Sequence, residues 1–277
     1  MRIWHQSFTD LDKVPLYRRT LVDHAARVVD AGNSVTVHGL KPGTYGPDFV
    51  PIDAIRHRYL EMLNESQIVE AVLTAEREGY DAVALGCFYD PGLRAARSLV
   101  DIPVVGLSET AMLVACSLGQ RFALIALNED QKAQHEEVAH VYGLERRLAA
   151  SLAMQPPIDE YMLEGDDDAT APIVEGFHAA CRRALEAGAE VIIPGDGVLN
   201  EFVWRKGLMR SGKATVVDSL GLLFRYAAFM AGCRSALGLE VSRVRHYAKP
   251  SPAMLRHARR FAGIRPIGED EFSGRGQ

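Results

Sequence analysis

Short apolar segments recur along this chain, and a longer segment of mixed polarity separates each one from the next. They include "AVALG" at 82–86, "FALIAL" at 122–127 and "VIIPG" at 191–195. None of them alternates between apolar and polar residues, which is typical of strands in a parallel sheet covered by helices on both faces. The intervening segments, such as "VPLYRRTLVDHAARVVDAG" at 14–32, have the pattern of amphipathic helices. Strands that alternate with helices predict an α/β fold with right-handed crossovers.

The composition excludes several classes of protein. The 277 residues are 48% hydrophobic, enough for one large core or two smaller ones, and the net charge is −5. A nucleic-acid-binding surface would require clustered Lys and Arg, which this balance does not favour. The chain shows no secretory signal pattern and no apolar run near the roughly 20 residues of a membrane span. We therefore expect a soluble, cytoplasmic protein without nucleic-acid or membrane partners.

The chain also repeats itself. Residues 76–87, "EREGYDAVALGC", align without a gap with residues 185–196, "LEAGAEVIIPGD", 109 positions later. The following units match as well, "IPVVGLSETAMLVA" at 102–115 with "ATVVDSLGLLFRYA" at 214–227. Two matches in the same order predict two pseudo-symmetric three-layer α/β/α lobes with parallel sheets and an active site in the cleft between them. We place lobe one at 1–106 plus 220–277 and lobe two at 107–219, and we interpret "EGDDDATAP" at 164–172 as a surface turn.

Two segments resemble a cofactor motif and a metal motif but do not match them. The run "GLMRSGKA" at 207–214 ends in Ala where a phosphate-binding loop needs Ser or Thr, and it precedes a strand instead of following one. His135 and His140 in "HEEVAH" are five positions apart, so they diverge around a helix and do not form a zinc motif. We expect no metal site.

Cys87 and Asp196 occupy equivalent positions of the repeat, each directly after an apolar strand and a glycine. In open α/β sheets the carboxyl ends of the strands form the working surface, so both side chains are expected to face one ligand from opposite lobes. The other three cysteines, Cys116, Cys181 and Cys233, are interpreted as small hydrophobic residues and free thiols. Asp196 at a helix start is either a functional acid or a helix cap.

The run "GCFYDPGLRAARSLVDIPVVGLSETAML" at 86–113 resembles the first catalytic cysteine region of the aspartate/glutamate/hydantoin racemase superfamily, and its hydantoin racemase branch most of all. The resemblance implies two lobes, each supplying one cysteine that moves a proton beside a carbonyl, without a cofactor. Cys87 matches the first cysteine. The second should lie in "VIIPGDGV", where this chain has Asp196.

That departure changes the expected chemistry. The pKa of a free cysteine thiol is ~8.5 and that of a free aspartate is ~3.9. Moving a proton from the thiol to the aspartate therefore costs roughly 6 kcal/mol. At neutral pH the aspartate is then the base and the thiol the acid, so one-directional proton delivery becomes as credible as racemisation.

The resemblance also implies that the loops at the strand ends bind the substrate. These positions carry Gln6, Ser7, Phe88, Tyr89, Asn128, Gly197 and Val198. Backbone N–H groups at the helix starts would hold a carboxylate or imide oxygen. Glu109 and Asp218, which also follow strands, are interpreted as helix caps.

Three functions remain open at this point. The leading one is a cofactor-independent racemase or isomerase acting at a carbon beside a carbonyl of a small carboxylate or hydantoin-like substrate. The first alternative is a lyase, decarboxylase or hydrolase that uses Cys87 as nucleophile or proton donor on a hydantoin-like or dicarboxylate substrate. The second is a noncatalytic ligand-binding relative. In each case we expect a small-molecule ligand and a homo-oligomer.

Overall fold

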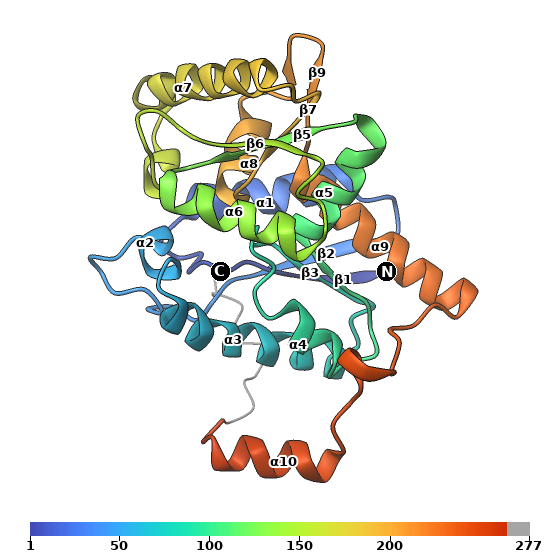
Figure 1. The fold of residues 1–277 in the computed structure, drawn as a ribbon. Helices are drawn as coiled ribbons and strands as arrows, with labels where there is room; N and C mark the ends of the chain where they lie inside the picture. Colours follow the sequence, from blue (N-terminus) through green and yellow to red (C-terminus); the bar gives the residue numbers. More distant parts are fainter. Residues whose placement is uncertain (265–277) are drawn as a thin grey trace.

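Two β-sheets, one above the other, organise the protein (Figure 1). The computed structural model describes residues 1–264. The strands are β1 (Arg2–Gln6), β2 (Ser34–His38), β3 (Ala82–Leu85), β4 (Val104–Gly106), β5 (Phe122–Ala126), β6 (Leu148–Ala153), β7 (Val191–Pro194), β8 (Arg210–Ser211) and β9 (Ala214–Val216). The helices are α1 (Pro15–Val28), α2 (Pro51–Ile55), α3 (Arg58–Arg77), α4 (Leu93–Arg97), α5 (Leu107–Leu118), α6 (Glu129–Val141), α7 (Asp167–Glu186), α8 (Gly197–Arg205), α9 (Ser219–Leu237) and α10 (Pro252–Phe261), with short 3₁₀ turns η1 (Tyr161–Glu164) and η2 (Arg245–Tyr247).

The two sheets have the same topology. The first has the order β2-β1-β3-β4 and is entirely parallel, and the second has the order β6-β5-β7-β9-β8. In the second sheet only the two-residue β8 is antiparallel, because it forms a hairpin with β9 at the edge. The predicted α/β fold with two lobes is confirmed, except that this edge strand breaks the purely parallel pattern.

Helices cover both faces of the first sheet. Alternate strand residues point to opposite sides, so Trp4, Val83 and Leu85 pack against α3 and α4 while Ile3 and Ala84 belong to a core shared with α1 and α9. In the second sheet α7 covers the outer face, and α5, α6 and α8 lie on the side that faces the first sheet (Figure 1). The strands are buried on both sides, which explains why their sequences lack alternation.

The repeat seen in the sequence is a structural repeat. With the same offset of 109 residues, α3 and α7 end at Arg77 and Glu186, and β3 and β7 begin at Ala82 and Val191. Each helix is followed by a left-handed glycine, Gly79 with φ of 76° and Gly188 with φ of 88°. Each unit therefore ends its helix, turns and starts its strand in the same way.

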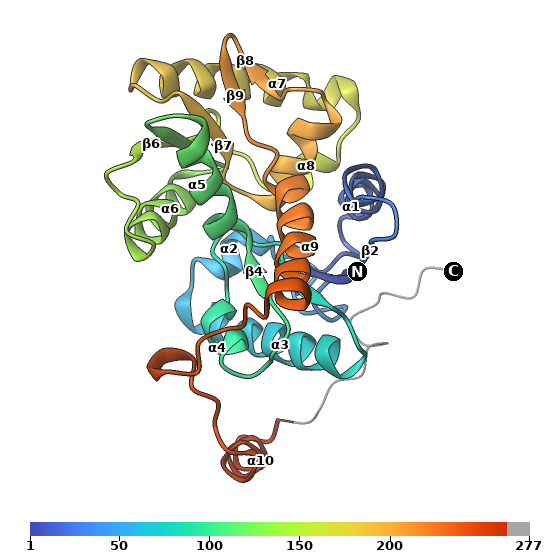
Figure 2. The ribbon, with the colours of Figure 1, turned by 90° about the vertical axis from the view of Figure 1, so that its right-hand side faces the viewer.

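Two long helices connect the lobes and pack side by side, as Figure 2 shows. α5 begins after β4 of the first sheet and α9 begins after β9 of the second, at positions that the sequence repeat makes equivalent. α9 then packs on the first sheet, in line with the return of the chain to lobe one. The exact lobe boundaries, 106/107 and 219/220, stay a prediction, and the last part of the range 220–277 lies outside the described residues.

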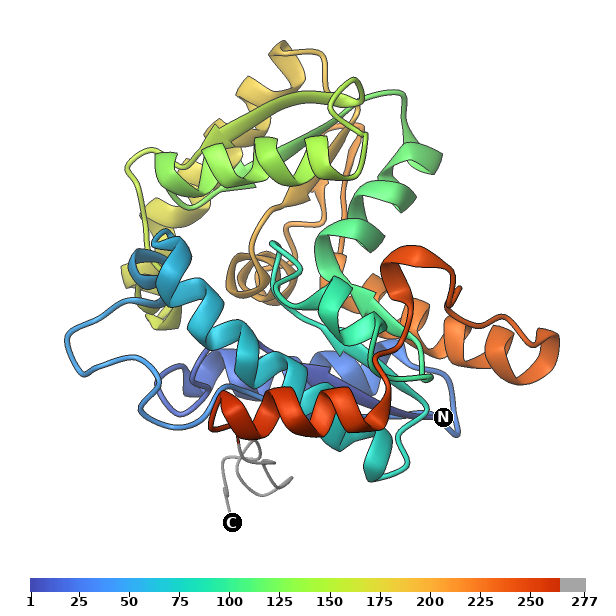
Figure 3. The same cartoon turned by 60° about the horizontal axis from the view of Figure 1, so that its bottom comes forward.

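One local prediction was wrong. The segment 164–172 is not only a turn, because α7 starts inside it at Asp167, with Asp166 as its cap accepting from the N–H of Ala169 at 2.9 Å. An Asp cap followed by two acidic residues is a helix-start signal that the polar composition concealed. At the other end of the chain, α10 lies along α3 (Figure 3), and Arg259 pairs with Glu70 at 2.5 Å. Over residues 1–264, no helix combines the length and apolar character needed to cross a membrane.

Candidate active site

Cys87 and Asp196 line one small cavity between the two sheets. Each follows its strand after a single glycine, so the repeat carries both side chains to the carboxyl ends of β3 and β7. The cavity has a volume of about 30 Å³. Its walls are formed by Ser7, Phe8, Thr9, Tyr17, Pro51, Ile55, Gly86, Cys87, Glu160, Asp196, Gly197 and Val198.

The glycines before the two residues are required by buried imidazoles. A Cβ on Gly86 would lie 2.1 Å from a ring carbon of His5, and a Cβ on Gly195 would lie 2.2 Å from one of His135. Burial lowers the pKa of His5 to about 3 and that of His135 to about 4, so both rings are neutral at physiological pH. They act as packing groups behind the two strand ends.

The two strand-end loops touch each other across the lobes. A Cβ on Gly197 would lie 2.8 Å from the carbonyl oxygen of Gly86 and 3.0 Å from the hydroxyl of Tyr17. Only glycine lets the start of α8 approach the Cys87 loop this closely. The contact brings the residues after β3 and β7 into one site.

Asp196 is the N-cap of α8 as well as a wall of the cavity. Its Oδ1 accepts from the N–H of Val198 at 2.8 Å and of Leu199 at 3.0 Å, and Oδ2 accepts from Gln131 Nε2 at 3.2 Å. Burial raises the pKa of this carboxyl, while the three N–H donors oppose the shift because they stabilise the charged form. The helix N-terminus favours the carboxylate further.

Cys87 is a neutral thiol in this environment. Burial raises its pKa well above the usual value, and the Asp196 carboxylate adds to the shift because it repels a second negative charge. The site therefore pairs a proton-bearing thiol with a carboxyl group whose donors favour its charged form. Such a pair can deliver a proton from one residue and accept one at the other.

The cavity contains a second carboxyl group, that of Glu160. This residue stands directly before η1, and only 4% of its surface is exposed. No Lys, Arg or His is among the described residues that form the walls. Across residues 1–264, no group of three or more His, Cys, Asp and Glu is arranged to hold a metal ion.

Comparison with known proteins identifies the family. The profile described as Asp/Glu/Hydantoin racemase matches residues 22–227. The chain belongs to this racemase family. A hydantoin racemase from Paenarthrobacter aurescens is 29% identical over 226 residues, covering 81% of this chain and 91% of that one. A hydantoin racemase from Pseudomonas sp. (strain NS671) is 28% identical over 198 residues, covering 71% and 75%.

Solved structures show the same fold. The allantoin racemase from Klebsiella pneumoniae has a TM-score of 0.72 with 23% identity, over 91% of this chain and 94% of that one. Glutamate racemase RacE1 from Bacillus anthracis has a TM-score of 0.53 with 15% identity, over 96% and 95%. Membership of the Asp/Glu/Hydantoin racemase family makes the chain a racemase-type enzyme and confirms the resemblance drawn from residues 86–113.

The racemase fold brings some of the predicted binding residues to the cavity. Ser7, Gly197 and Val198 line it together with Cys87 and Asp196. Asn128 does not; its side chain caps α6 by accepting from the N–H of Gln131 at 3.0 Å. Asn128 contacts the site only indirectly, because Gln131 also donates a hydrogen bond to Asp196.

Gln6 and Phe88 have structural contacts instead. The Gln6 amide donates to the carbonyl of Gly39 at 2.8 Å and accepts from Trp4 Nε1 at 3.0 Å, which fixes it inside lobe one. Phe88 is 1% exposed and lies edge-on to the ring of His135, with centroids 5.2 Å apart. Neither forms a wall of the cavity.

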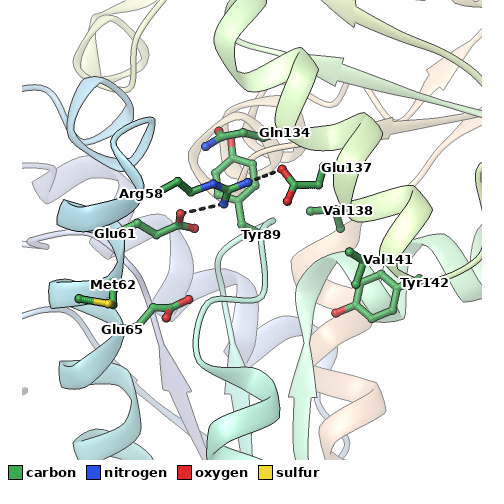
Figure 4. A pocket seen from close by; sticks show the side chains of 10 residues that line it. All are labelled: Arg58, Glu61, Met62, Glu65, Tyr89, Gln134, Glu137, Val138, Val141 and Tyr142. Atoms are coloured by element: carbon green, nitrogen blue, oxygen red, sulfur yellow. Dashed lines mark hydrogen bonds and ion pairs between the residues drawn. The ribbon is translucent and has the colours of Figure 1, made fainter.

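Tyr89 lines a different pocket, on the α3–α6 side of the molecule (Figure 4). This pocket has a volume of about 290 Å³. Arg58 of α3 pairs there with Glu61 at 2.9 Å and with Glu137 of α6, so its guanidinium links the two lobes. Burial raises the pKa of Tyr89 well above its usual value, and Cys87 and Asp196 add to the shift, so Tyr89 stays near these two residues although it lines the neighbouring pocket.

Of the two residues predicted to be helix caps, Asp218 is one and Glu109 is not. Asp218 caps α9 by accepting from the N–H of Gly221 at 3.0 Å, as expected. Glu109 does not cap α5, whose N–H groups at Ser108 and Glu109 donate to Asp90 at 3.1 and 2.9 Å. The Glu109 carboxylate instead pairs with Arg97 at 2.5 Å.

Sequence reasoning missed Tyr17, Thr9 and Glu160. Thr9 lies three positions after the end of β1, so its place near a strand end is a signal that could have identified it. Tyr17 is in the first turn of α1, and burial raises its pKa well above the usual value. Glu160 lies between β6 and α7, in a segment without a periodic pattern, so no local signal marks it.

Proposed function

We propose that the protein is a cofactor-independent enzyme that moves a proton at a carbon beside a carbonyl of a hydantoin-like substrate. The observation that supports it most is that Cys87 and Asp196 reach one cavity from equivalent strand ends of two lobes. Relatives named hydantoin racemase and structural neighbours named allantoin racemase point to a ring with carbonyl and N–H groups as the substrate.

In the proposed reaction the Asp196 carboxylate takes the proton from the substrate carbon, and the Cys87 thiol gives a proton to the opposite face of that carbon. The product carries inverted configuration, Asp196 is left protonated and Cys87 is left as thiolate. A proton exchange with solvent then restores both residues. The free-energy gap between thiol and carboxyl lets kcat differ between the two enantiomers, whereas kcat/KM is the same for both because enantiomers have equal free energies.

Substrate binding must enlarge the cavity. Pockets for small molecules typically have volumes of about 300–1,000 Å³, about tenfold or more above the 30 Å³ available here. We therefore propose that the lobes separate to admit the substrate and approach again around it.

The test is deuterium exchange. The protein is incubated in D₂O with each enantiomer of a 5-substituted hydantoin, and the C5 proton is followed by NMR and the optical activity by circular dichroism. We expect loss of the C5 proton together with loss of optical activity. Ring opening or bond cleavage without exchange would instead support the lyase or hydrolase alternative, and no change with any enantiomer would remove the proposal.

The pH profile assigns the two roles. Burial raises the pKa of both Asp196 and Cys87, so we expect kcat/KM to rise with pH as Asp196 ionises, above the usual range of an aspartate, and to fall only above the usual range of a thiol. Asp196→Asn keeps a good helix cap and removes the base, so activity should drop by at least about 100-fold without unfolding α8. Activity that rises with a thiolate-like pKa and lacks an acid limb contradicts this assignment.

A further inference from the structure

Glu160 is fixed in place from both of its sides. On one side, the N–H of Ile158 donates to the carbonyl of Leu127 at 3.1 Å, next to β5. On the other side, the Glu164 carboxylate accepts from the N–H groups of Leu16 and Tyr17 at 2.7 and 2.8 Å, at the start of α1. The segment 158–164 thus spans from the second sheet to a helix of the first lobe, and Glu160 is held at the cavity wall between them.

One oxygen of the Glu160 carboxyl group lacks a partner. Within residues 1–264, Oε2 is buried and makes no hydrogen bond, although the residue is 96% buried and lines the cavity beside Asp196. A buried carboxyl oxygen without a partner is unfavourable by about 1–3 kcal/mol, unless a ligand satisfies it. Its position indicates a contact that a bound molecule completes.

The charges around Glu160 oppose its ionisation. The titratable groups around it are Asp196, Cys87 and Tyr17 at the cavity, Asp159 and Tyr161 on its own segment, and Tyr45 and Tyr89 from the first lobe. None of these groups is a cation. Burial, and after it the Asp196 carboxylate, raises the pKa of Glu160 well above its usual value.

Two buried carboxyl groups that line one small cavity oppose each other's ionisation, and the donors around them decide which one ionises first. Asp196 receives three N–H groups and caps a nine-residue helix. Around Glu160, the backbone N–H groups of Ile52 and of its own residue lower the pKa, but burial and Asp196 outweigh them, and Oε2 has no partner within residues 1–264. Asp196 is therefore the carboxylate of the pair, and Glu160 is the acid.

We propose that Glu160 is a substrate-binding residue whose protonated carboxyl donates a hydrogen bond from Oε2 to a carbonyl oxygen of the ligand. This inference rests on the proposed function, because it takes the ligand to be a ring with carbonyl groups. The proton stays on Glu160 throughout, so the residue stabilises the negative charge that develops on that oxygen when the neighbouring carbon loses its proton.

The same arrangement selects against free carboxylates. A ligand carboxylate would face Asp196 in a cavity whose described walls carry no cation, and like charges disfavour binding. A neutral ring that offers a carbonyl to Glu160 and N–H groups to Asp196 satisfies both. The site should therefore prefer a hydantoin over its ring-opened carbamoyl amino acid, which bears a carboxylate.

The test compares Glu160→Gln, Glu160→Leu and an exposed control, Glu145→Gln, with the unaltered protein. Binding of 5-benzylhydantoin and of N-carbamoylphenylalanine is measured by calorimetry, and exchange at C5 is measured in D₂O. Gln keeps a donor of the same shape and Leu removes it. We expect the Gln variant to bind the hydantoin within about threefold of the unaltered protein and the Leu variant to bind at least about tenfold more weakly.

Infrared difference spectroscopy measures whether the Glu160 carboxyl group carries a proton. A protonated carboxyl group gives a carbonyl stretch distinct from that of a carboxylate, and we expect this band at neutral pH in the unaltered protein and in Glu145→Gln but not in Glu160→Gln. On raising the pH, the band should disappear together with hydantoin binding in the unaltered protein. Ionisation of the ligand affects all variants alike, so binding that weakens equally in Glu160→Gln contradicts the inference.

The outcomes separate this inference from the proposed function. If the hydantoin binds and depends on Glu160 but does not exchange, the inference stands and the proton-transfer function falls. If exchange occurs while Glu160→Leu binds as well as the unaltered protein, the function stands and the inference falls. Absence of the band at neutral pH overturns the inference in every case, and failure of the hydantoin to bind overturns both.

Discussion

At the scale of single residues, Asp196 shows that a cap and a functional acid are not exclusive alternatives. Its Oδ1 accepts from the first N–H groups of α8, and the same carboxyl group forms a wall of the cavity with Cys87. The cap fixes the rotamer of the side chain, and the N–H donors set the balance of its protonation. A residue can therefore cap its helix and accept a proton, because both capping hydrogen bonds go to Oδ1, and Oδ2 accepts only one hydrogen bond among the described residues, from Gln131 Nε2.

The role of Cys87 can be separated from that of an ordinary buried cysteine. We expect Cys87→Ala to abolish turnover and C5 exchange, because the proton donor is gone, while the unfolding free energy changes by less than about 1 kcal/mol. Cys181→Ala is the matched control: its side chain is fully buried in α7, so it should cost about 1 kcal/mol or more and leave kcat unchanged. Urea unfolding and steady-state kinetics on both variants give the comparison, and equal losses of activity would remove the case for Cys87.

At the scale of secondary-structure elements, the approach of the two strand-end loops determines the site. The start of α8 lies against the Cys87 loop and against Tyr17 of α1, with room for a hydrogen but not for a methyl group at residue 197. The loops come from different lobes, so their contact also fixes the distance between the lobes at this point. Packing here is tight enough that one added carbon must displace backbone atoms.

Gly197→Ala tests this contact. The added Cβ would meet the Gly86 carbonyl at 2.8 Å, so we expect a loss of about 1–3 kcal/mol in the unfolding free energy and a fall in kcat/KM as the loops move apart. Gly232→Ala in α9 is the control, because no atom lies within 4 Å of its added Cβ and alanine favours a helix, which predicts a gain of up to about 1 kcal/mol. If both variants change the unfolding free energy by the same amount, the close approach of the two loops does not contribute to stability.

At the scale of the whole molecule, a buried ionic group links the lobes next to the site. His24 of α1 lies between two carboxylates, with Nδ1 2.7 Å from Glu201 of α8 and Nε2 2.8 Å from Asp218 at the start of α9. Its ring is fully buried and stacks on Trp204 with centroids 4.1 Å apart. Burial lowers the pKa of His24, but the hydrogen bonds with Asp218 and Glu201 outweigh it and raise the pKa to about 9.

This group makes stability depend on pH in a defined window. The pKa of His24 is higher in the folded protein, about 9, than the unperturbed value of 6.5, so its contribution is complete below pH 6.5 and is lost as the pH rises through 9. The shift corresponds to about 3 kcal/mol at the lower pH. We expect His24→Gln to be less stable than the unaltered protein at pH 6 and the difference to shrink by pH 9.5. Urea unfolding at both pH values measures it, with the exposed His257→Gln as control; a difference that stays constant or grows would contradict the assignment.

The sequence by itself determined the strands, the α/β class, the repeat and the equivalence of Cys87 with Asp196. All of these depend on local patterns: uninterrupted apolar strands, helix-end glycines and the spacing between them. Only the tertiary structure decided that Tyr89 and Phe88 form no wall of this cavity while Tyr17 and Glu160 do. Those side chains are placed by contacts between segments more than 100 residues apart, such as Glu164 with the start of α1, and by burial that sets which groups keep their protons. Neither the direction of a side chain nor the charge of its neighbours is encoded in the periodicity of a single segment.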